Sequence, residues 1–212
     1  MIVFGPSASP FVRKVLVFAA EKGLEVESRA GGPGSPPDAA FLAASPFGKI
    51  PGFQDGDFAI SDSSAIVAYM EKSKADPVLI PTERRAHART IWFDEFADTI
   101  LAAPVTTMFF NRMVARLMGL EGNLEAADKA EQETLPRVLA YLEGVIPASG
   151  FLVEDRLTLA DIAVAAPFAN LGHMGCDAAA KGYPKTAAWA AGILARASFA
   201  KLIAAEKAMF GG

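Results

Sequence analysis

The spacing of apolar residues changes near residue 80 of this chain. Up to about residue 75 it switches between the period of two typical of strands and the period of three to four typical of helices, whereas from about residue 84 onward it is helical almost throughout. The segment between the two patterns contains Pro77 and Pro81, as linkers often do. We therefore expect two domains, residues 1–76 and 84–212, joined by residues 77–83.

The beginning of the first domain predicts a βαβ unit. Met1 to Phe4 and Leu24 to Ser28 are short β-prone runs. Between them, Pro10 to Lys22 has apolar residues at helical spacing, and Gly23 stands where a helix commonly ends. Strands that are joined through a crossing helix are parallel, so we expect a parallel pair.

The remainder of this domain predicts an antiparallel hairpin between two helices. A short helix is expected over Asp38 to Ala44 and a longer one over Ser63 to Lys74. The strands Gly52–Gln54 and Phe58–Ile60 flank Asp55-Gly56-Asp57, where Asp-Gly tolerates the positive φ angles of a tight turn. The order β-α-β-α-β-β-α describes a small mixed sheet with helices on its faces.

The second domain is expected to be entirely helical, which makes the fold class α/β plus all-α. Pro104 and Pro167 should kink or break their helices, because proline lacks a backbone donor and clashes with the preceding turn. The expected helices cover Glu83 to Met118, Glu125 to Val145, Leu159 to Leu171, Lys185 to Arg196 and Ser198 to Met209.

The composition excludes several classes of function. Lys and Arg number 20 against 24 Asp and Glu, and no basic run is longer than a pair, so nucleic acid is not an expected partner. No stretch approaches the roughly 18 charge-free apolar residues of a membrane span, so no membrane association is expected. The single cysteine cannot form an internal disulfide, which fits a reducing compartment, and we expect a cytoplasmic protein.

Common catalytic patterns are missing from the sequence. It has no G-x-S-x-G nucleophile elbow, no Walker loop and no dinucleotide fingerprint. His173 and Cys176 could face one another on a helical turn, but two ligands do not make a zinc site, and no metal is expected. His87 lies among arginines and is expected at the surface.

Ser9 stands at the beginning of the first predicted helix, directly before Pro10. One interpretation is structural, because a serine at the N-cap can accept a hydrogen bond from the N–H of Val12. The other is functional, because a hydroxyl at the positive end of a helix can point to a bound anion or thiolate. Ser7 lies two residues earlier and could take the same role, but Ser9 is preferred because it precedes the proline.

Gly48-Lys49-Ile50-Pro51 places a proline directly before a strand that is expected inside the sheet. Such a position needs special geometry, because proline cannot donate to a sheet ladder. We expect a cis Ile50-Pro51 bond, which exposes the backbone of Ile50 to an extended peptide ligand. A trans proline at the beginning of the strand is the alternative.

Three segments together resemble the glutathione-binding motifs of one family. They are Ser9-Pro10-Phe11-Val12-Arg13-Lys14-Val15, Gly48-Lys49-Ile50-Pro51 and Asp62-Ser63-Ser64-Ala65-Ile66. In order and relative position they are similar to those of cytosolic glutathione S-transferases, in particular serine-type, bacterial-like members. The resemblance covers essentially the whole chain and implies an N-terminal thioredoxin-like domain, an all-helical C-terminal domain and a homodimer.

The resemblance also implies a role for each matching residue. Ser9 takes the position of the catalytic residue that activates the thiol of glutathione, the cosubstrate. Lys49 lies beside the glycyl end, Ile50 before Pro51 pairs through its backbone with the cysteinyl part, and Asp62 and Ser63 receive the γ-glutamyl end. Asp62 could instead be only a helix cap.

The electrophile that accepts the thiolate would be a small hydrophobic molecule bound between the domains. Its expected lining consists of Phe11, Phe96, Phe109, Phe110 and Met113. Redox-type relatives carry cysteine where this chain has Ser9, so thiol–disulfide exchange by the protein itself is not expected. Two other functions remain open from the sequence: a non-catalytic binding or scaffold protein, and a glutathione-dependent isomerase or dehalogenase.

Thr158-Leu159-Ala160-Asp161 resembles the capping box that the family carries at the start of a buried helix. The carboxylate of Asp161 can accept from the N–H of Thr158. We expect a structural role here and no catalytic one.

Overall fold

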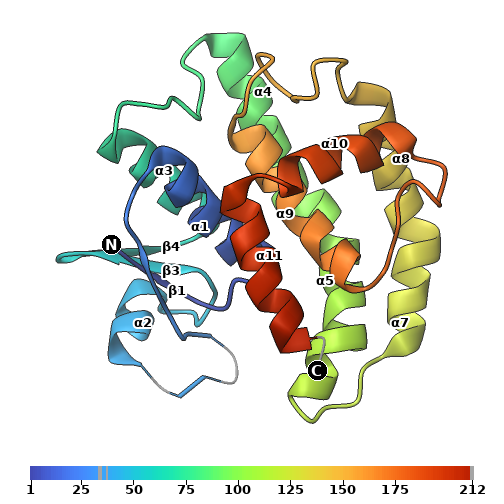
Figure 1. Cartoon of the computed structure of the whole chain (residues 1–212). Helices are drawn as coiled ribbons and strands as arrows, with labels where there is room; N and C mark the ends of the chain where they lie inside the picture. Colours follow the sequence, from blue (N-terminus) through green and yellow to red (C-terminus); the bar gives the residue numbers. More distant parts are fainter. Residues whose placement is uncertain (33–34, 37, 211–212) are drawn as a thin grey trace. The chain divides into compact units, whose positions relative to one another are not determined.

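The computed structural model describes residues 1–32, 35–36 and 38–210. The chain forms two compact units, Met1–Pro81 and Thr82–Gly212 (Figure 1). The boundary falls between Pro81 and Thr82, so residues 77–81 belong to the first unit.

The first unit is built on a sheet of four strands in the order β2-β1-β3-β4. The parallel pair β1 (Ile2–Phe4) and β2 (Glu27–Arg29) and the antiparallel hairpin of β3 (Gly52–Asp55) and β4 (Phe58–Ser61) confirm the predicted topology. β2 begins later than its sequence pattern indicates, because the register with β1 pairs Ile2 with Glu27.

Three helices cover the two faces of this sheet (Figure 1). α1 (Pro10–Lys22) and α3 (Ser63–Ser73) pack against each other on one face, and α2 (Ala39–Ala44) packs against the other. Gly23 ends α1 in the left-handed conformation, with φ of 62°, as predicted. The fold is therefore the thioredoxin-like arrangement that the sequence implies.

The two central strands, β1 and β3, bury residues on both faces of the sheet, since neighbouring residues of a strand point to opposite sides and helices cover each side. Val3 and Phe53 are Cα partners, and the ring of Phe53 lies 5.4 Å from that of Tyr69 on α3. Phe4 points the other way and forms a cluster with Phe41 and Ala44 of α2.

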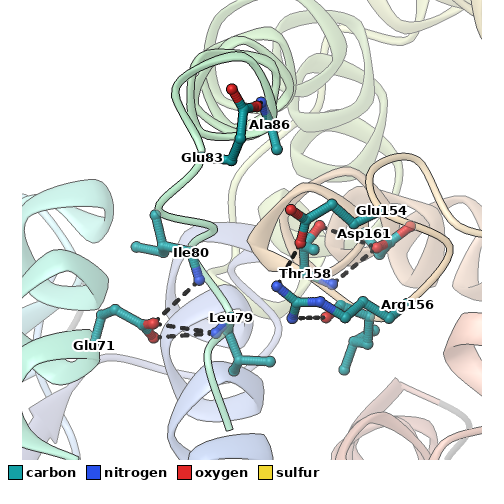
Figure 2. A network of polar contacts seen from close by, with 10 residues as sticks. Glu71, Leu79, Ile80, Glu83, Ala86, Glu154, Arg156, Thr158 and Asp161 are labelled. Carbon is teal, nitrogen blue, oxygen red and sulfur yellow. Dashed lines mark hydrogen bonds and ion pairs between the residues drawn. The ribbon is translucent and has the colours of Figure 1, made fainter. Parts of the chain in front are cut away.

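The segment after α3 is held against α1 and α3 by an ion pair between Lys22 and Glu71. Glu71 accepts hydrogen bonds from the backbone N–H groups of Leu79 and Ile80, at 3.2 and 3.3 Å (Figure 2). Lys22 lies 3.1 Å from the Glu71 carboxylate and donates to the carbonyl of Pro77 at 2.7 Å. Residues 77–80 therefore follow a fixed path along α1 and α3.

The second unit is helical throughout, as predicted. Its helices are α4 (Arg84–Glu95), α5 (Ala102–Phe109), α6 (Ala115–Leu117), α7 (Leu124–Lys129), α8 (Leu135–Val145), α9 (Leu159–His173), α10 (Pro184–Leu194) and α11 (Ala197–Phe210), with π-helical segments η1 (Phe96–Leu101), η2 (Phe110–Val114) and η3 (Ala130–Thr134). Two of the expected helices, Glu83 to Met118 and Glu125 to Val145, are therefore divided by wider π-helical turns.

The two internal prolines behave differently from each other. In an α-helix the ring of Pro104 would clash with the carbonyl of Ile100, four residues earlier. Ile100 lies in η1, and the wider π-helical turn there relieves this clash. α9 instead runs without a break through Pro167. Every residue of α9 from Leu159 to Leu171 is buried, and this packing holds the helix together despite the missing donor.

No single helix in the described part of the chain is long and apolar enough to cross a membrane. α10 and α11 meet the length and composition requirements only when taken together, across a bend of 92°.

Candidate active site

The sheet register brings the three motif segments to one end of the first unit. Gly52, the first residue of β3, is the Cα partner of Phe4 on β1 and of Ser61 on β4. Because β3 is antiparallel to both neighbours, the end of β1, the beginning of β3 and the end of β4 lie side by side. Ser9 follows the first, Pro51 precedes the second and Asp62 follows the third.

Ser9 is the N-cap residue of α1, with Pro10 in the first helical position. Its backbone is extended, with φ of −71° and ψ of 126°, and its carbonyl accepts from the N–H of Arg13 at 2.9 Å. Within the described residues its side chain makes no capping hydrogen bond. The half-buried hydroxyl thus lies at the positive end of a 13-residue helix without serving that helix.

Gly5 brings the loop before Ser9 into contact with Ile50. Its φ of 127° is a conformation that residues with a side chain rarely adopt. A Cβ at this position would lie 2.7 Å from a methyl carbon of Val12 and 3.1 Å from the Cβ of Ile50. The close approach that glycine permits here therefore places the Ser9 loop directly beside the second motif.

The backbone before β3 turns sharply at Ile50. The Ile50-Pro51 bond is cis, as predicted. The strand pairing begins only at Gly52, so the N–H and C=O of Ile50 take no part in the ladder. The hydroxyl of Ser45 donates to the carbonyl of Lys49 at 2.7 Å, which fixes the turn while the Lys49 side chain is exposed.

Asp62 and Ser63 begin α3. Asp62 is the N-cap, and its Oδ1 accepts from the N–H groups of Ser64 and Ala65, at 3.0 Å each, so the capping role that the sequence left open is present. Its φ of 81° is unusual for a residue other than glycine, and such backbone strain is concentrated at functional sites. Ser63 is 3% exposed.

The other singled-out residues have structural partners. His173 lies 2.9 Å from Glu206, both buried, whereas Cys176 lies 3.7 Å from Glu131. Burial raises the pKa of the Cys176 thiol, the opposite of what a reactive thiolate requires. In the described ranges no group of three His, Cys, Asp or Glu could hold a metal ion, and His87 is exposed.

The predicted capping box of α9 is confirmed. The N–H of Thr158 donates to Asp161 Oδ2 at 3.0 Å, and Asp161 is fully buried (Figure 2). Of the expected electrophile lining, Phe96 and Phe109 are buried within the second unit, whereas Phe110 is 43% exposed. The composition of that lining stays a prediction.

Sequence reasoning missed the buried cations of α1. Arg13, Lys14 and Lys22 are all buried, although lysine and arginine seldom are. The only signal in the sequence is that Arg13 and Lys14 interrupt an apolar run.

The two units match two family models in turn. Residues 3–78 match the glutathione S-transferase N-terminal domain, and residues 96–197 match the glutathione S-transferase C-terminal domain. Glutathione S-transferase 3 of Zea mays is 31% identical over 96% of this chain and 93% of its own length. Glutathione S-transferase of Hyoscyamus muticus is 29% identical over 96% of this chain and 97% of its length.

Solved structures agree with these matches. Glutathione transferase F2 from Populus trichocarpa has a TM-score of 0.84 at 25% identity, over 98% of this chain and 99% of that one. A thioredoxin-like unit that carries the site motifs at one end of its sheet, followed by a helical unit, defines a class of transferases. The chain belongs to the glutathione S-transferase family.

Proposed function

We propose that the chain activates the thiol of glutathione, its cosubstrate, at Ser9 and transfers the thiolate to a small hydrophobic electrophile. One observation carries the role of Ser9: its hydroxyl lies at the N-terminus of α1 and, among the described residues, does not cap the helix. The hydroxyl is therefore available to donate to a sulfur atom.

The chemistry that Ser9 supplies is modest. A free thiol has a pKa of about 8.5 and is mostly protonated at neutral pH. Lowering this pKa by one or two units takes about 1.4 to 2.7 kcal/mol, which a charge-assisted hydrogen bond and a helix dipole can supply. The thiol proton leaves to solvent and the sulfur forms a bond to the electrophilic carbon. With an aryl halide, the carbon–halogen bond then breaks and the halide leaves with the electron pair of that bond. Ser9 donates a hydrogen bond and is not itself the nucleophile.

The remaining motif residues support binding of the peptide backbone and the two ends of glutathione. The backbone of Ile50, which precedes Pro51 and takes no part in the sheet ladder, suits the cysteinyl part, and the exposed ammonium of Lys49 suits the glycyl carboxylate. The N-terminus of α3 at Ser63 favours the γ-glutamyl carboxylate. Asp62 uses Oδ1 for its cap, which leaves Oδ2 to accept from the ligand's ammonium.

The test compares Ser9→Ala with Ser7→Ala as the matched control in the same loop. Ser9→Ala should fold and bind glutathione, while the pKa of the bound thiol, followed by thiolate ultraviolet absorbance, rises by about one unit or more. Turnover with an aryl halide should fall near neutral pH and partly recover at higher pH. Ser7→Ala should leave the titration nearly unchanged. An unchanged titration in Ser9→Ala would contradict the assigned role.

We also propose that the protein is a homodimer. Phe47 of the first unit is 89% exposed, and Trp92 and Ile100 of the second are 46% and 43% exposed beside a groove of about 340 Å³. Apolar surface of this kind is commonly covered by a partner, and closed dimers are the commonest assembly. Sedimentation that shows only a 22.3 kDa species at micromolar concentration would contradict the dimer. The serine-type, bacterial-like subtype and the cytoplasmic location stay predictions.

A further inference from the structure

Lys14 is a buried charge that connects two ends of the candidate site. It lies on α1, five residues after Ser9, and is 1% exposed. Removing an ammonium from water is costly unless it is hydrogen-bonded, so such a residue is normally tied to particular partners. Its Nζ donates to the hydroxyl of Ser64 at 3.2 Å. Lys14 thereby joins the helix that begins at Ser9 to the first turn of α3.

Ser64 belongs to the turn that is expected to receive the γ-glutamyl end of glutathione. Its backbone N–H donates to Asp62 at 3.0 Å, and its hydroxyl accepts from Lys14. The turn is therefore held from two sides: Asp62 shapes its backbone, and Lys14 anchors it to α1. The position of the neighbouring Ser63 relative to α1 depends on both contacts.

We propose that Lys14 is a positioning residue that sets the distance between the thiol end and the γ-glutamyl end of the site. It acts through Ser64 and does not itself touch the substrate. Its role is to hold the first turn of α3 where one peptide can reach both Ser9 and Ser63, which favours γ-glutamyl thiols over thiols that lack this group. The inference rests on the proposed function, which places the γ-glutamyl end at Asp62 and Ser63.

Lys22 is a matched control on the same helix. It is 0% exposed and, like Lys14, makes hydrogen bonds from its ammonium. Its partners are Pro77 and Glu71, and Glu71 lies in the last turns of α3 rather than in the first. Both lysines therefore join α1 to α3, but only Lys14 does so at the end that carries the candidate site.

The experiment measures steady-state kinetics of the full chain with glutathione and an aryl halide. Lys14→Met keeps an unbranched side chain as far as Cε and removes the ammonium, and with it the charge and the donor. We expect the KM for glutathione to rise about tenfold, while kcat changes by less than about twofold, since misplacing a binding group weakens binding without altering the thiol. Lys14→Arg should restore most of the affinity. Lys22→Met should leave this KM unchanged even where it lowers the melting temperature.

Two further readouts separate positioning from general destabilisation. Cysteinylglycine lacks the γ-glutamyl group, so the wild-type protein and Lys14→Met should bind it with equal affinity in a calorimetric titration. Ser64→Ala removes the same contact from the half-buried start of α3 and should raise the glutathione KM about threefold, with little further effect when added to Lys14→Met. This second variant tests the contact even if Lys14→Met does not fold.

The outcomes distinguish this inference from the proposed function. A wild-type protein that binds no glutathione overturns both. If the wild-type protein binds glutathione, then an unchanged KM in Lys14→Met or Ser64→Ala overturns the positioning role alone. The positioning role is also overturned if Lys14→Met loses as much affinity for cysteinylglycine as for glutathione, or if Lys22→Met raises the glutathione KM as much as Lys14→Met does. Either result would show that Lys14 has a purely structural role.

Discussion

Replacing Asp161 with asparagine tests how a buried carboxylate stabilises the second unit. Asp161 is fully buried and accepts four hydrogen bonds. Oδ1 accepts from the N–H of Leu152 at 2.8 Å and from the indole N–H of Trp189 at 3.4 Å, and Oδ2 accepts from the N–H and hydroxyl of Thr158 at 3.0 and 3.3 Å. Asparagine has the same shape, but its amide NH₂ would face donors where an oxygen now accepts.

The loss in the free energy of unfolding that Asp161→Asn causes depends on pH. Burial raises the pKa of Asp161 to about 6 from 3.8, although the backbone and side-chain donors act in the opposite direction. Between these values the folded state holds more protons than the unfolded state. The contribution of Asp161 to stability is therefore complete below pH 3.8 and is lost as the pH rises through 6. From pH 4.5 to 7.5 this loss amounts to about 2 kcal/mol.

Asp161→Asn should therefore be more costly in acid than at neutral pH. An unsatisfied buried donor costs about 1–3 kcal/mol, so we expect a loss of about 3 kcal/mol in the free energy of unfolding at pH 4.5 and about 1 kcal/mol at pH 7.5. Urea unfolding of both proteins at the two pH values, followed by circular dichroism, measures the difference. The titration of other groups cancels in the comparison.

The opposite trend would refute this reasoning. A cost that grows from pH 4.5 to 7.5 would mean that the four donors outweigh burial and keep the carboxylate charged. A cost independent of pH would mean that the pKa of Asp161 is the same in the folded and unfolded states.

Two other predictions concern the second unit and the assembly. The carboxylate of Glu143 accepts hydrogen bonds from Lys185 and Thr186. Burial raises the pKa of Glu143, but these donors outweigh burial and lower the pKa below 4.5. The contribution of Glu143 to stability is therefore present above pH 4.5 and is lost as the pH falls. In pH-dependent thermal unfolding, Glu143→Ala should thus show its largest loss at neutral pH, and a larger loss in acid would contradict the assignment. Phe47→Ser should dissociate the proposed dimer in sedimentation experiments without lowering the monomer's stability, because Phe47 is 89% exposed; an unchanged dimer would exclude Phe47 from the interface.

Local chemistry made much of the first unit predictable from the sequence. The Asp-Gly turn at Gly56 and the glycine end of α1 at Gly23 depend on backbone conformations that few residues adopt. The buried lysines were not predictable, because a periodic pattern identifies an apolar face but not the polar partners that a second helix supplies. Lys14 acquires its partner only when α3 packs beside α1.

The candidate site was predictable in its parts and not in its contacts. The order of the motifs placed Ser9, Ile50 and Asp62 in the site. The sequence left open whether Ser9 caps the helix that begins at Pro10 and whether Asp62 caps the helix that begins at Ser63. The structure assigns the cap on α3 to Asp62 and, among the described residues, gives Ser9 no capping bond. Such choices depend on φ and ψ angles and side-chain directions that one-dimensional spacing does not contain.

The double pairing of Gly52 makes the first unit suitable for loop exchange. Backbone partners on β1, β3 and β4 fix the points at which the three site loops leave the sheet. Loops from other family members could therefore be grafted at Phe4 and Ser61 without redesign of the sheet. The limit of such grafts is Gly52 itself, where a Cβ would lie 3.2 Å from the ring of Phe41, so libraries should vary the loops and keep this residue.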